Sequence, residues 1–302
     1  MNKKIAFIFP GQGAQYVGMG KQFYEAFPEA RAVFDEAGDH LKKIIFEGPM
    51  EELTQTAIAQ VAIFVTSVAI LRCIPIKPDV CAGLSLGEYT ALVAAGRVDF
   101  ASALKLVAAR GKYMQEACEM EKGSMRVVLG LEESQVAACL SEGAWIANLN
   151  CPGQVVIAGN ETALHAAEEK LKAAGARRVL PLEVSGAFHT PLMRPAQEKL
   201  QSLLLSAPLQ SSDVELVMNV PGAFVQGAEE MRQNLIAQVA SPTRWEKGIR
   251  AMMEAGVTTF IEIGPGKTLS GMNKKIGVGE TFSVEKPADL AQLEALYATA
   301  QR

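Results

Sequence analysis

The chain has few of the residues that metal sites and disulfide frameworks require. It contains five cysteines and three histidines among 302 residues, and no C-x-x-C spacing occurs. Widely scattered cysteines in an odd number predict reduced thiols and a cytoplasmic location, and the scarcity of histidine argues against a zinc site. A buried cysteine usually acts as a small hydrophobic residue, so none of the five is predicted to be catalytic.

The sequence also lacks a long apolar run and an excess of positive charge. No stretch forms the roughly 18 uninterrupted apolar residues of a membrane span, and the apolar run over residues 5–9 is too short for a signal peptide. The 29 basic and 33 acidic residues give a net charge of −4. This balance provides no overall attraction for nucleic acid or an anionic membrane, and we expect neither as a partner.

Short apolar runs alternate with helical segments along much of the chain. A buried strand is predicted over residues 4–9, an amphipathic helical region over 20–43 and a buried helix over 54–71. Later strands are predicted near 215–219 and 259–263, and a helix over 229–239. This alternation favours an α/β fold with a parallel sheet.

The pattern changes between residues 123 and 189. Strands are predicted over 125–129, 145–150, 154–158 and 176–184, and helices over 132–141 and 162–174. The resulting β-α-β-β-α-β order is ferredoxin-like. We therefore expect residues 123–189 to form a small subdomain, inserted into a large one made of residues 1–122 and 190–302.

A candidate nucleophile lies in the G-x-S-x-G pattern of residues 83–87, centred on Ser85. Glycines in this pattern permit a sharp turn that lifts a serine hydroxyl above the end of a strand. Residues 78–82 are predicted to form that strand, and 88–95 the helix whose amino end stabilises negative charge. The alternative is an ordinary glycine turn in which the serine caps a helix.

A serine hydroxyl needs a base to become a good nucleophile. His165 lies in a predicted helix rich in alanine, glutamate and lysine, and His40 in a polar turn. His189 lies where the small subdomain ends, and clefts form at such junctions. We favour His189 as the base, and the alternative is a histidine that only satisfies a loop.

A second glycine turn, residues 10–15, directly follows the first predicted strand. It is not a dinucleotide fingerprint because position 16 is tyrosine, and residues 261–268 fail as a phosphate loop because position 261 is isoleucine. An oxyanion hole needs two converging N–H donors, one from the residue after the nucleophile and one from another loop. Leu86 and Gln12 are the candidates.

These motifs belong to an ordered set that extends over nearly the whole chain. The set comprises Phe9-Pro10-Gly11-Gln12-Gly13, residues 83–92, residues 110–115, residues 152–159, Gly186-Ala187-Phe188-His189 and residues 262–267. In this set the sequence resembles the malonyl-CoA:acyl carrier protein transacylases. The resemblance implies an α/β-hydrolase-like large subdomain with an inserted ferredoxin-like small one.

The resemblance also implies a catalytic role for each matching residue. Ser85 is expected to be acylated, with His189 as its general base. Gln238 is expected to orient His189 through an amide carbonyl in place of the usual carboxylate. Gln12 and Leu86 are expected to donate their backbone N–H groups to the oxyanion.

Three further residues are expected to bind substrate. The Arg110 guanidinium suits a bidentate pair with the malonyl carboxylate. Phe188 resembles the malonyl-selective version of its motif, and its ring, like the Met114 side chain, would shield the acyl-enzyme from water. Leu84 departs from the family, which usually has histidine there, and this departure puts a polar contact near the acyl or coenzyme A pocket in doubt.

The implied reaction is ping-pong transfer of malonyl from coenzyme A to the phosphopantetheine thiol of acyl carrier protein, without a metal or redox cofactor. Acyl carrier proteins are acidic, so Arg177-Arg178 and Lys274-Lys275 are candidates for a docking patch, unless they are ordinary solvated charges.

Two other functions remain open at this stage. One is a serine esterase or thioesterase, in which the histidine usually comes late in the chain, whereas residues 190–302 contain none. The other is a non-catalytic homologue that only binds carrier protein, an alternative suggested by Leu84.

Overall fold

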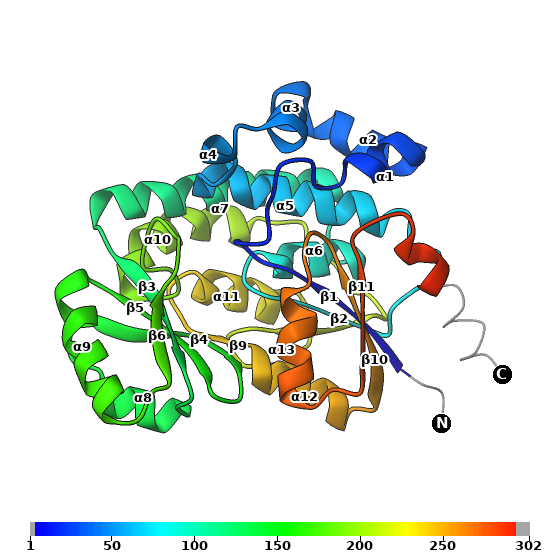
Figure 1. Ribbon diagram of the computed structural model, residues 1–302. Coiled ribbons are helices and arrows are strands. Elements are labelled where there is room, and N and C mark those ends of the chain that lie inside the picture. Colours follow the sequence, from blue (N-terminus) through cyan, green and yellow to red (C-terminus); the bar gives the residue numbers. More distant parts are fainter. Residues whose placement is uncertain (1–3, 294–302) are drawn as a thin grey trace.

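The computed structural model describes residues 4–293, which form two β-sheets surrounded by helices (Figure 1). The larger sheet has six strands in the order β11-β10-β1-β2-β7-β8. Its strands are β1 (Lys4–Phe9), β2 (Val80–Gly83), β7 (Glu215–Met218), β8 (Ala223–Val225), β10 (Val257–Ile263) and β11 (Glu280–Val284). All neighbouring pairs are parallel except β7 with β8. The expected parallel α/β sheet is confirmed.

The central position of β1 explains its apolar sequence. Alternate side chains of a strand point to opposite faces, and both faces of this sheet are covered. Phe7 and Phe9 pack into the core on one face, while Ala6 and Ile8 pack on the other. The carboxyl ends of β1, β2 and β10 meet at one edge, where open α/β sheets commonly carry their sites.

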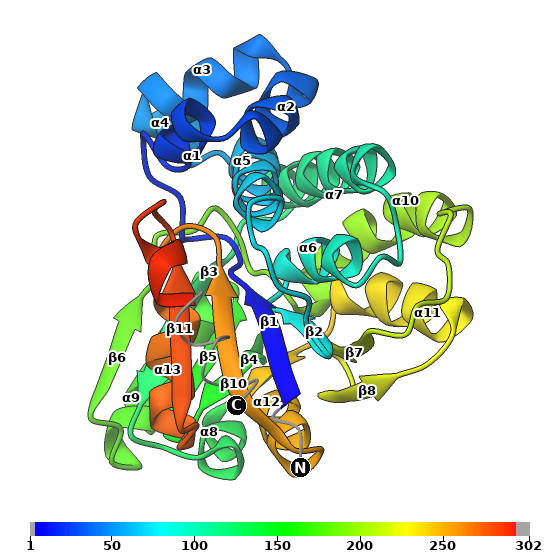
Figure 2. The ribbon, with the colours of Figure 1, turned by 90° about the vertical axis from the view of Figure 1, so that its right-hand side faces the viewer.

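Helices cover the two faces of the large sheet (Figure 2). One face packs on α5 (Thr56–Leu71), α6 (Gly87–Ala94), α7 (Phe100–Met120), α10 (Arg194–Leu205) and α11 (Ala228–Gln238). The other face packs on α12 (Trp245–Glu254) and α13 (Thr268–Ile276). The single-turn η1 (Pro191–Met193) precedes α10.

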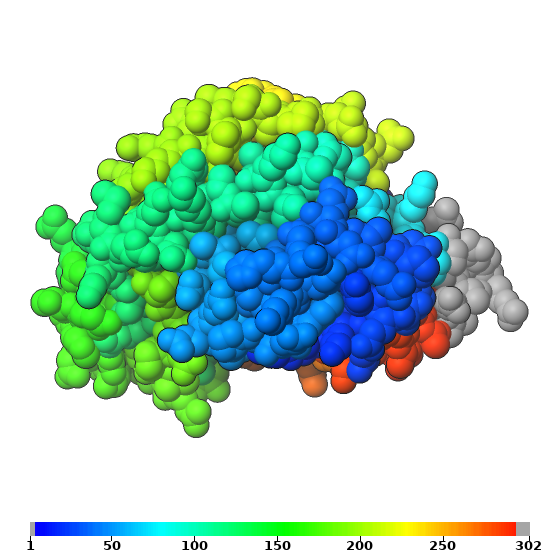
Figure 3. Space-filling view, turned by 90° about the horizontal axis from the view of Figure 1, so that it is seen from above, coloured from blue at the N-terminus to red at the C-terminus, as the bar shows by residue number. Residues whose placement is uncertain are grey.

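Residues 20–43, expected as one helical region, form separate helices over α5 instead (Figure 1). Figure 3 shows this N-terminal part of the chain, in blue, at the surface of one face of the molecule. They are α1 (Lys21–Ala26), α2 (Pro28–Ala37) and α3 (Asp39–Glu47), followed by α4 (Met50–Leu53). Phe27 precedes a proline and is extended, and Gly38 has φ +98°, so the helix is interrupted at both points. His40 consequently lies in α3 and not in a turn.

The small sheet has the order β6-β3-β5-β4-β9. It contains β3 (Ser124–Leu129), β4 (Ala144–Cys151), β5 (Gln154–Gly159) and β6 (Arg178–Pro181), with α8 (Glu133–Cys139) and α9 (Glu161–Ala173) between them. These elements have the expected ferredoxin-like order. The sequence did not predict β9 (Thr243–Arg244), which pairs in parallel with β4 and brings a strand from beyond residue 189 into this sheet.

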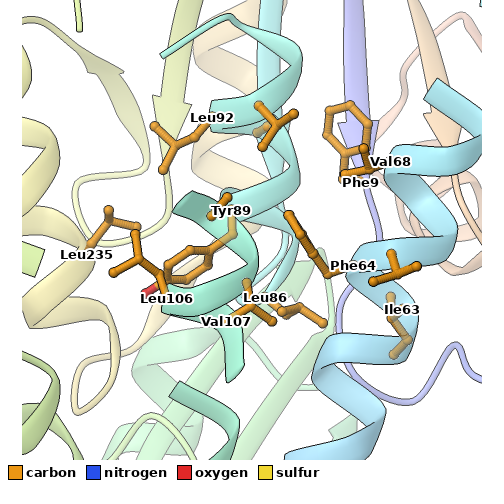
Figure 4. Packing of buried hydrophobic residues seen from close by; sticks show 14 of the residues in the cluster. Phe9, Ile63, Phe64, Val68, Leu86, Tyr89, Leu92, Leu106, Val107 and Leu235 are labelled. Atoms are coloured by element: carbon orange, nitrogen blue, oxygen red, sulfur yellow. The ribbon is translucent and has the colours of Figure 1, made fainter. Parts of the chain in front are cut away.

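The buried helix expected over residues 54–71 is α5, which contributes Ile63, Phe64 and Val68 to the main hydrophobic cluster (Figure 4). Phe64 on this helix is fully buried and stacks on Phe100 of α7, with ring centroids 5.6 Å apart. Leu86, next to Ser85, packs into the same cluster. No helix within residues 4–293 is long and apolar enough to span a membrane.

Replacing Phe64 with alanine is expected to lower the free energy of unfolding by about 3–5 kcal/mol, because the ring leaves a cavity in a close-packed region. Chemical denaturation measures the change. Leu205→Ala serves as the control, since Leu205 is 46% exposed and should change stability by less than about 0.5 kcal/mol. Equal effects of the two substitutions would contradict this prediction.

Candidate active site

Ser85 lies in a tight turn between β2 and α6, as the G-x-S-x-G pattern predicts. Its backbone has φ +52°, a left-handed conformation that costs free energy in a non-glycine residue. The flanking glycines are required by contact, since a Cβ on Gly83 would lie 1.9 Å from the Gly87 carbonyl carbon, and one on Gly87 2.2 Å from the Phe9 carbonyl oxygen. The turn is therefore held closely against β1.

His189 meets Ser85 from the connection that follows the small sheet. Its Nε2 lies 2.8 Å from Ser85 Oγ, and its side chain is buried. Its φ is +61°, and among the described residues only Ser85 and His189 combine a positive φ with a side chain. Strained backbone of this kind is concentrated at functional sites. The other two histidines, His40 and His165, are exposed and far less constrained.

The second ring nitrogen determines the tautomer of His189. Nδ1 lies 2.8 Å from the backbone carbonyl oxygen of Gln238, which only accepts hydrogen bonds, so Nδ1 carries the proton. Nε2 is then free to accept the hydroxyl hydrogen of Ser85. Burial and the nearby charge of Arg110 lower the pKa of His189 to about 4, so the ring is neutral at pH 7.

Gln238 is expected to orient His189 through an amide carbonyl in place of a carboxylate, and the carbonyl that does so is the one of its backbone. The backbone carbonyl accepts from His189, while the side-chain amide is used elsewhere. Its Nε2 donates to the Ser85 carbonyl oxygen at 2.8 Å and to Glu88 at 2.6 Å. Its Oε1 accepts from Arg110 at 2.9 Å. Every polar atom of this buried side chain is therefore paired.

Arg110 projects from α7 to the nucleophile and is only 1% exposed. Nη2 donates to Ser85 Oγ at 3.0 Å, and Nη1 donates to Gln60 Oε1 at 2.6 Å. The guanidinium carbon lies 5.7 Å from the centre of the Tyr89 ring. Burial lowers the pKa of Arg110, and the charges of Tyr89 and Glu88 oppose that shift. An arginine side chain stays protonated in proteins, so a cation faces Ser85 Oγ.

Glu88 and Asn219 also belong to the site, although the sequence did not predict a role for either. Glu88 follows the G-x-S-x-G pattern directly and is 1% exposed. Burial raises its pKa to about 8, although hydrogen bonds from Asn219 and Gln238 and the charge of Arg110 oppose the change. Asn219, directly after β7, is 3% exposed and bonds to the tight turn that carries Ser85. The only signal in the sequence was the position of each polar residue at the boundary of a buried element.

The two candidate oxyanion donors lie at the same sheet edge. Phe9 pairs with Gly83 in the parallel register of β1 and β2, so the residues that follow each strand lie side by side. Gly11 is required for this approach, because a Cβ there would lie 2.6 Å from the Leu84 carbonyl oxygen. Among the described residues, no acceptor bonds to the backbone N–H of Gln12 or Leu86.

Ser85 and His189 open into a cavity of about 310 Å³ between the two sheets. Its wall includes Leu84, Phe188 and the N-terminal part of α13, together with residues 10–14 and residues of β3, β4 and β5. Met114 does not line this cavity; it is buried against Gln60, whose Nε2 lies 3.5 Å from its sulfur. Arg110 also lies behind the wall and reaches the nucleophile through Ser85 Oγ.

A second cavity of about 340 Å³ lies beyond Gln154, which lines both, and it includes neither Ser85 nor His189. The exposed Lys275 donates to Gln154 Oε1 at 3.0 Å, so its ammonium group lies beside a residue that lines both cavities, and Lys274 next to it is also exposed. Arg177 and Arg178 are exposed at the start of β6. Within residues 4–293 the cysteines are free thiols, and no three acidic, cysteine or histidine side chains form a metal-binding group.

The lowered pKa of His189 predicts that its ring stays neutral from about pH 7 to about pH 5 and gains a proton only near pH 4. Nuclear magnetic resonance of ¹⁵N-labelled histidine side chains measures this titration, with the exposed His40 and His165 as references in the same sample. Protonation of His189 near its ordinary value of 6.5 would contradict the prediction.

Known proteins resemble this chain over nearly its whole length. The Malonyl CoA-acyl carrier protein transacylase of Bacillus subtilis (strain 168) is 46% identical over 298 residues, which cover 94% of each chain. The protein of the same name from Escherichia coli (strain K12) is 41% identical over 286 residues, covering 90% of this chain and 93% of that one.

Solved structures are similarly close. The transacylase structure from Streptococcus pneumoniae has a TM-score of 0.92 and 43% identity, covering 97% of this chain and all of the other. A malonyl-transacylase in complex with a holo type II polyketide synthase acyl carrier protein also has a TM-score of 0.92, at 39% identity, covering 96% and 98%. Residues 6–285 match the model of the acyl transferase domain. The chain therefore belongs to the acyl transferase domain family.

Proposed function

We propose that this protein transfers malonyl from coenzyme A to the phosphopantetheine thiol of acyl carrier protein through an ester on Ser85. One observation carries the proposal: Ser85 Oγ lies within hydrogen-bond distance of both a neutral histidine and an arginine. The histidine activates the hydroxyl, and the arginine supplies a charge suited to an acyl group that ends in a carboxylate. The names of the close relatives agree with this substrate and acceptor.

Acylation begins when His189 Nε2 takes the Ser85 hydroxyl proton as Oγ attacks the thioester carbonyl carbon. The C–O bond forms, the C–S bond breaks, and the leaving thiolate takes the proton from the imidazolium. Transfer to the carrier protein reverses these steps with the phosphopantetheine thiol as nucleophile. Thioester and ester carbonyl carbons have the same oxidation state, so the proposed reaction requires no redox cofactor.

The imidazolium formed in each step is stabilised by a neutral partner, the Gln238 carbonyl. A neutral acceptor stabilises it less than a carboxylate does. The positive charge of Arg110 beside Ser85 Oγ compensates on the nucleophile side, because it favours the developing alkoxide. The backbone N–H groups of Gln12 and Leu86 would receive the charge on the tetrahedral oxygen.

The distal carboxylate of malonyl is separated from the acylated Oγ by only a carbonyl carbon and a methylene. It can therefore reach the guanidinium of Arg110 that now donates to Ser85 Oγ. A carboxylate that loses water on entering an apolar cavity needs a paired cation there. Acetyl lacks this group, so Arg110 would select malonyl over acetyl.

Apolar residues would protect the ester from hydrolysis. Phe188 and Leu84 line the cavity beside Ser85, where they exclude water and limit room for a methyl branch. Met114 would contribute only indirectly, through Gln60 and its hydrogen bond to Arg110. Lys275 donates to Gln154, which lines the cavity, so we favour Lys274-Lys275 as the docking site for the acidic carrier protein. A cytoplasmic location is part of the proposal.

Brief incubation with malonyl-CoA is expected to yield protein that is one malonyl group heavier, because the ester is an obligatory intermediate. Mass spectrometry of the intact chain and of its peptides should place the group on Ser85, and Ser85→Ala should carry none. Label that persists in this variant, or that maps to a cysteine, would defeat the assignment.

Arg110→Ala is expected to reduce kcat/KM for malonyl-CoA by at least about 10-fold, since a charged hydrogen-bonded pair contributes roughly 1.5–3 kcal/mol. The value for acetyl-CoA should fall less, because acetyl transfer loses only the stabilisation of the Ser85 alkoxide and not a carboxylate pair. Arg97→Ala is the matched control, because Arg97 is also buried but donates to the Val214 carbonyl away from the nucleophile. An unchanged malonyl-to-acetyl ratio in Arg110→Ala would show that selectivity resides elsewhere.

A further inference from the structure

The backbone polar groups on either side of Leu84 lie at the end of β2 or just beyond it, where no neighbouring strand completes their hydrogen bonds. β2 ends at Gly83 and its parallel neighbour β7 at Met218, with Ala82 opposite Val217. The next residue along this edge is Asn219. Buried backbone polar groups need partners, so the Gly83 carbonyl needs a donor and the Ser85 N–H needs an acceptor from elsewhere.

The side chain of Asn219 supplies both. Its Oδ1 accepts the backbone N–H of Ser85 at 2.6 Å, and its Nδ2 donates to the Gly83 carbonyl oxygen at 2.7 Å. A primary amide offers the same donor and acceptor as a peptide group, so Asn219 continues the hydrogen-bond pattern of β7 by one step. The bonds are made from a side chain that is 3% exposed, where a missing partner is costly.

We propose that Asn219 is the positioning residue of the nucleophile: its amide holds Ser85 in the left-handed conformation that places Oγ between His189 and Arg110. The inference rests on the proposed function, in which Ser85 is acylated. A strained φ persists only where the surroundings determine it strongly, and the amide grips the chain on both sides of Leu84. With its own N–H taken by Asn219, Ser85 leaves oxyanion binding to Leu86 and Gln12.

Asn219 is itself fixed, and its support also serves the base. Its backbone N–H donates to Glu88 Oε1 at 2.5 Å, and its carbonyl accepts from the Arg244 N–H at 2.9 Å. The other oxygen of Glu88 accepts from Gln238, whose carbonyl holds His189. One buried carboxyl group thus connects the support of the nucleophile to the support of the histidine.

Asn219→Asp distinguishes positioning from a general contribution to stability. An ionised aspartate of the same shape accepts from Ser85 N–H but cannot donate to the Gly83 carbonyl. A protonated aspartate can do both. Burial disfavours the ionised form of this aspartate, so the protonated form becomes more populated as the pH falls. Single-turnover acylation by malonyl-CoA should be about 10²-fold slower than in wild type near pH 8, the size of effect that a small misplacement of a reacting group produces. The KM should change little.

The pH dependence is the decisive readout. The ratio of variant to wild-type acylation rate should rise several-fold between about pH 8 and about pH 6. The ionisable groups that face the amide, or lie one residue beyond it, are Glu88 on α6, Arg110 on α7, His189 and Arg244 on β9. All of them are present in both proteins, so the ratio removes the effect on rate that they have in common, including that of Glu88, whose pKa of about 8 lies within this range. His189 stays neutral over this range, since its pKa is lowered to about 4.

Asn273→Asp is the matched control. Asn273 on α13 is fully buried, but its side chain bonds to Thr281 and not to the turn that carries Ser85. The Asn273→Asp substitution should lower the melting temperature. The acylation rate of the folded variant should stay within about 2-fold of wild type at both pH values, as expected for independent sites. Asn219→Ser is a second variant, whose shorter side chain cannot span both backbone groups; it should be slow at every pH, with a flat ratio.

Five outcomes decide the inference. A slow Asn219→Asp whose ratio to wild type rises as pH falls supports it, as does a slow Asn219→Ser with a flat ratio if the aspartate variant does not fold. Wild-type acylation rates in either folded variant, or a flat ratio for Asn219→Asp, would overturn it. Absence of label on Ser85 in the wild-type protein itself would overturn the proposed function, and this inference with it.

Discussion

The hydrogen bond between Ser85 Oγ and His189 Nε2 is the contact on which the rest of the site depends. It joins a turn at the edge of the large sheet to the segment that leaves the small sheet, so both sheets must be in place before it can form. Each partner has a backbone conformation that is unfavourable for its residue type. The fold therefore stores strain at both ends of one hydrogen bond, and the surrounding contacts must outweigh that strain.

Those contacts are made by buried polar groups, and burying a polar group costs free energy unless it has a hydrogen-bond partner. Arg110 meets only neutral oxygen atoms among the described residues, those of Gln60, Ser85 and Gln238. The amide of Gln238 lies between Arg110 and Glu88, accepting from the cation and donating to the carboxyl group. This arrangement leaves the guanidinium without a carboxylate partner of its own, which suits a residue proposed to receive the carboxylate of a substrate.

The sequence determined the local parts of this arrangement. The strand over residues 4–9, the glycines at 83 and 87, and the order of strands and helices along the small subdomain follow from alternation, turn chemistry and periodicity, all of which act over a few residues. Elimination among three histidines identified His189 because two of them lie in polar surroundings. Family resemblance added Arg110 and Gln238, which periodicity alone does not distinguish from residues on a solvated helix.

Only the tertiary structure decided which atoms meet. The contact of Gln238 with His189 through its backbone carbonyl, the position of Met114 behind the cavity wall, and the pairing of β9 with β4 depend on how distant elements pack. Asn219 and Glu88 show the same limit. Asn219 is 134 residues from Ser85 and 131 from Glu88 along the sequence, yet it forms a hydrogen bond with each of them. Local patterns specify which residues can be buried, whereas the pairing of buried polar groups is settled when the sheets close around them, since an unpaired donor or acceptor there costs more than any local preference supplies.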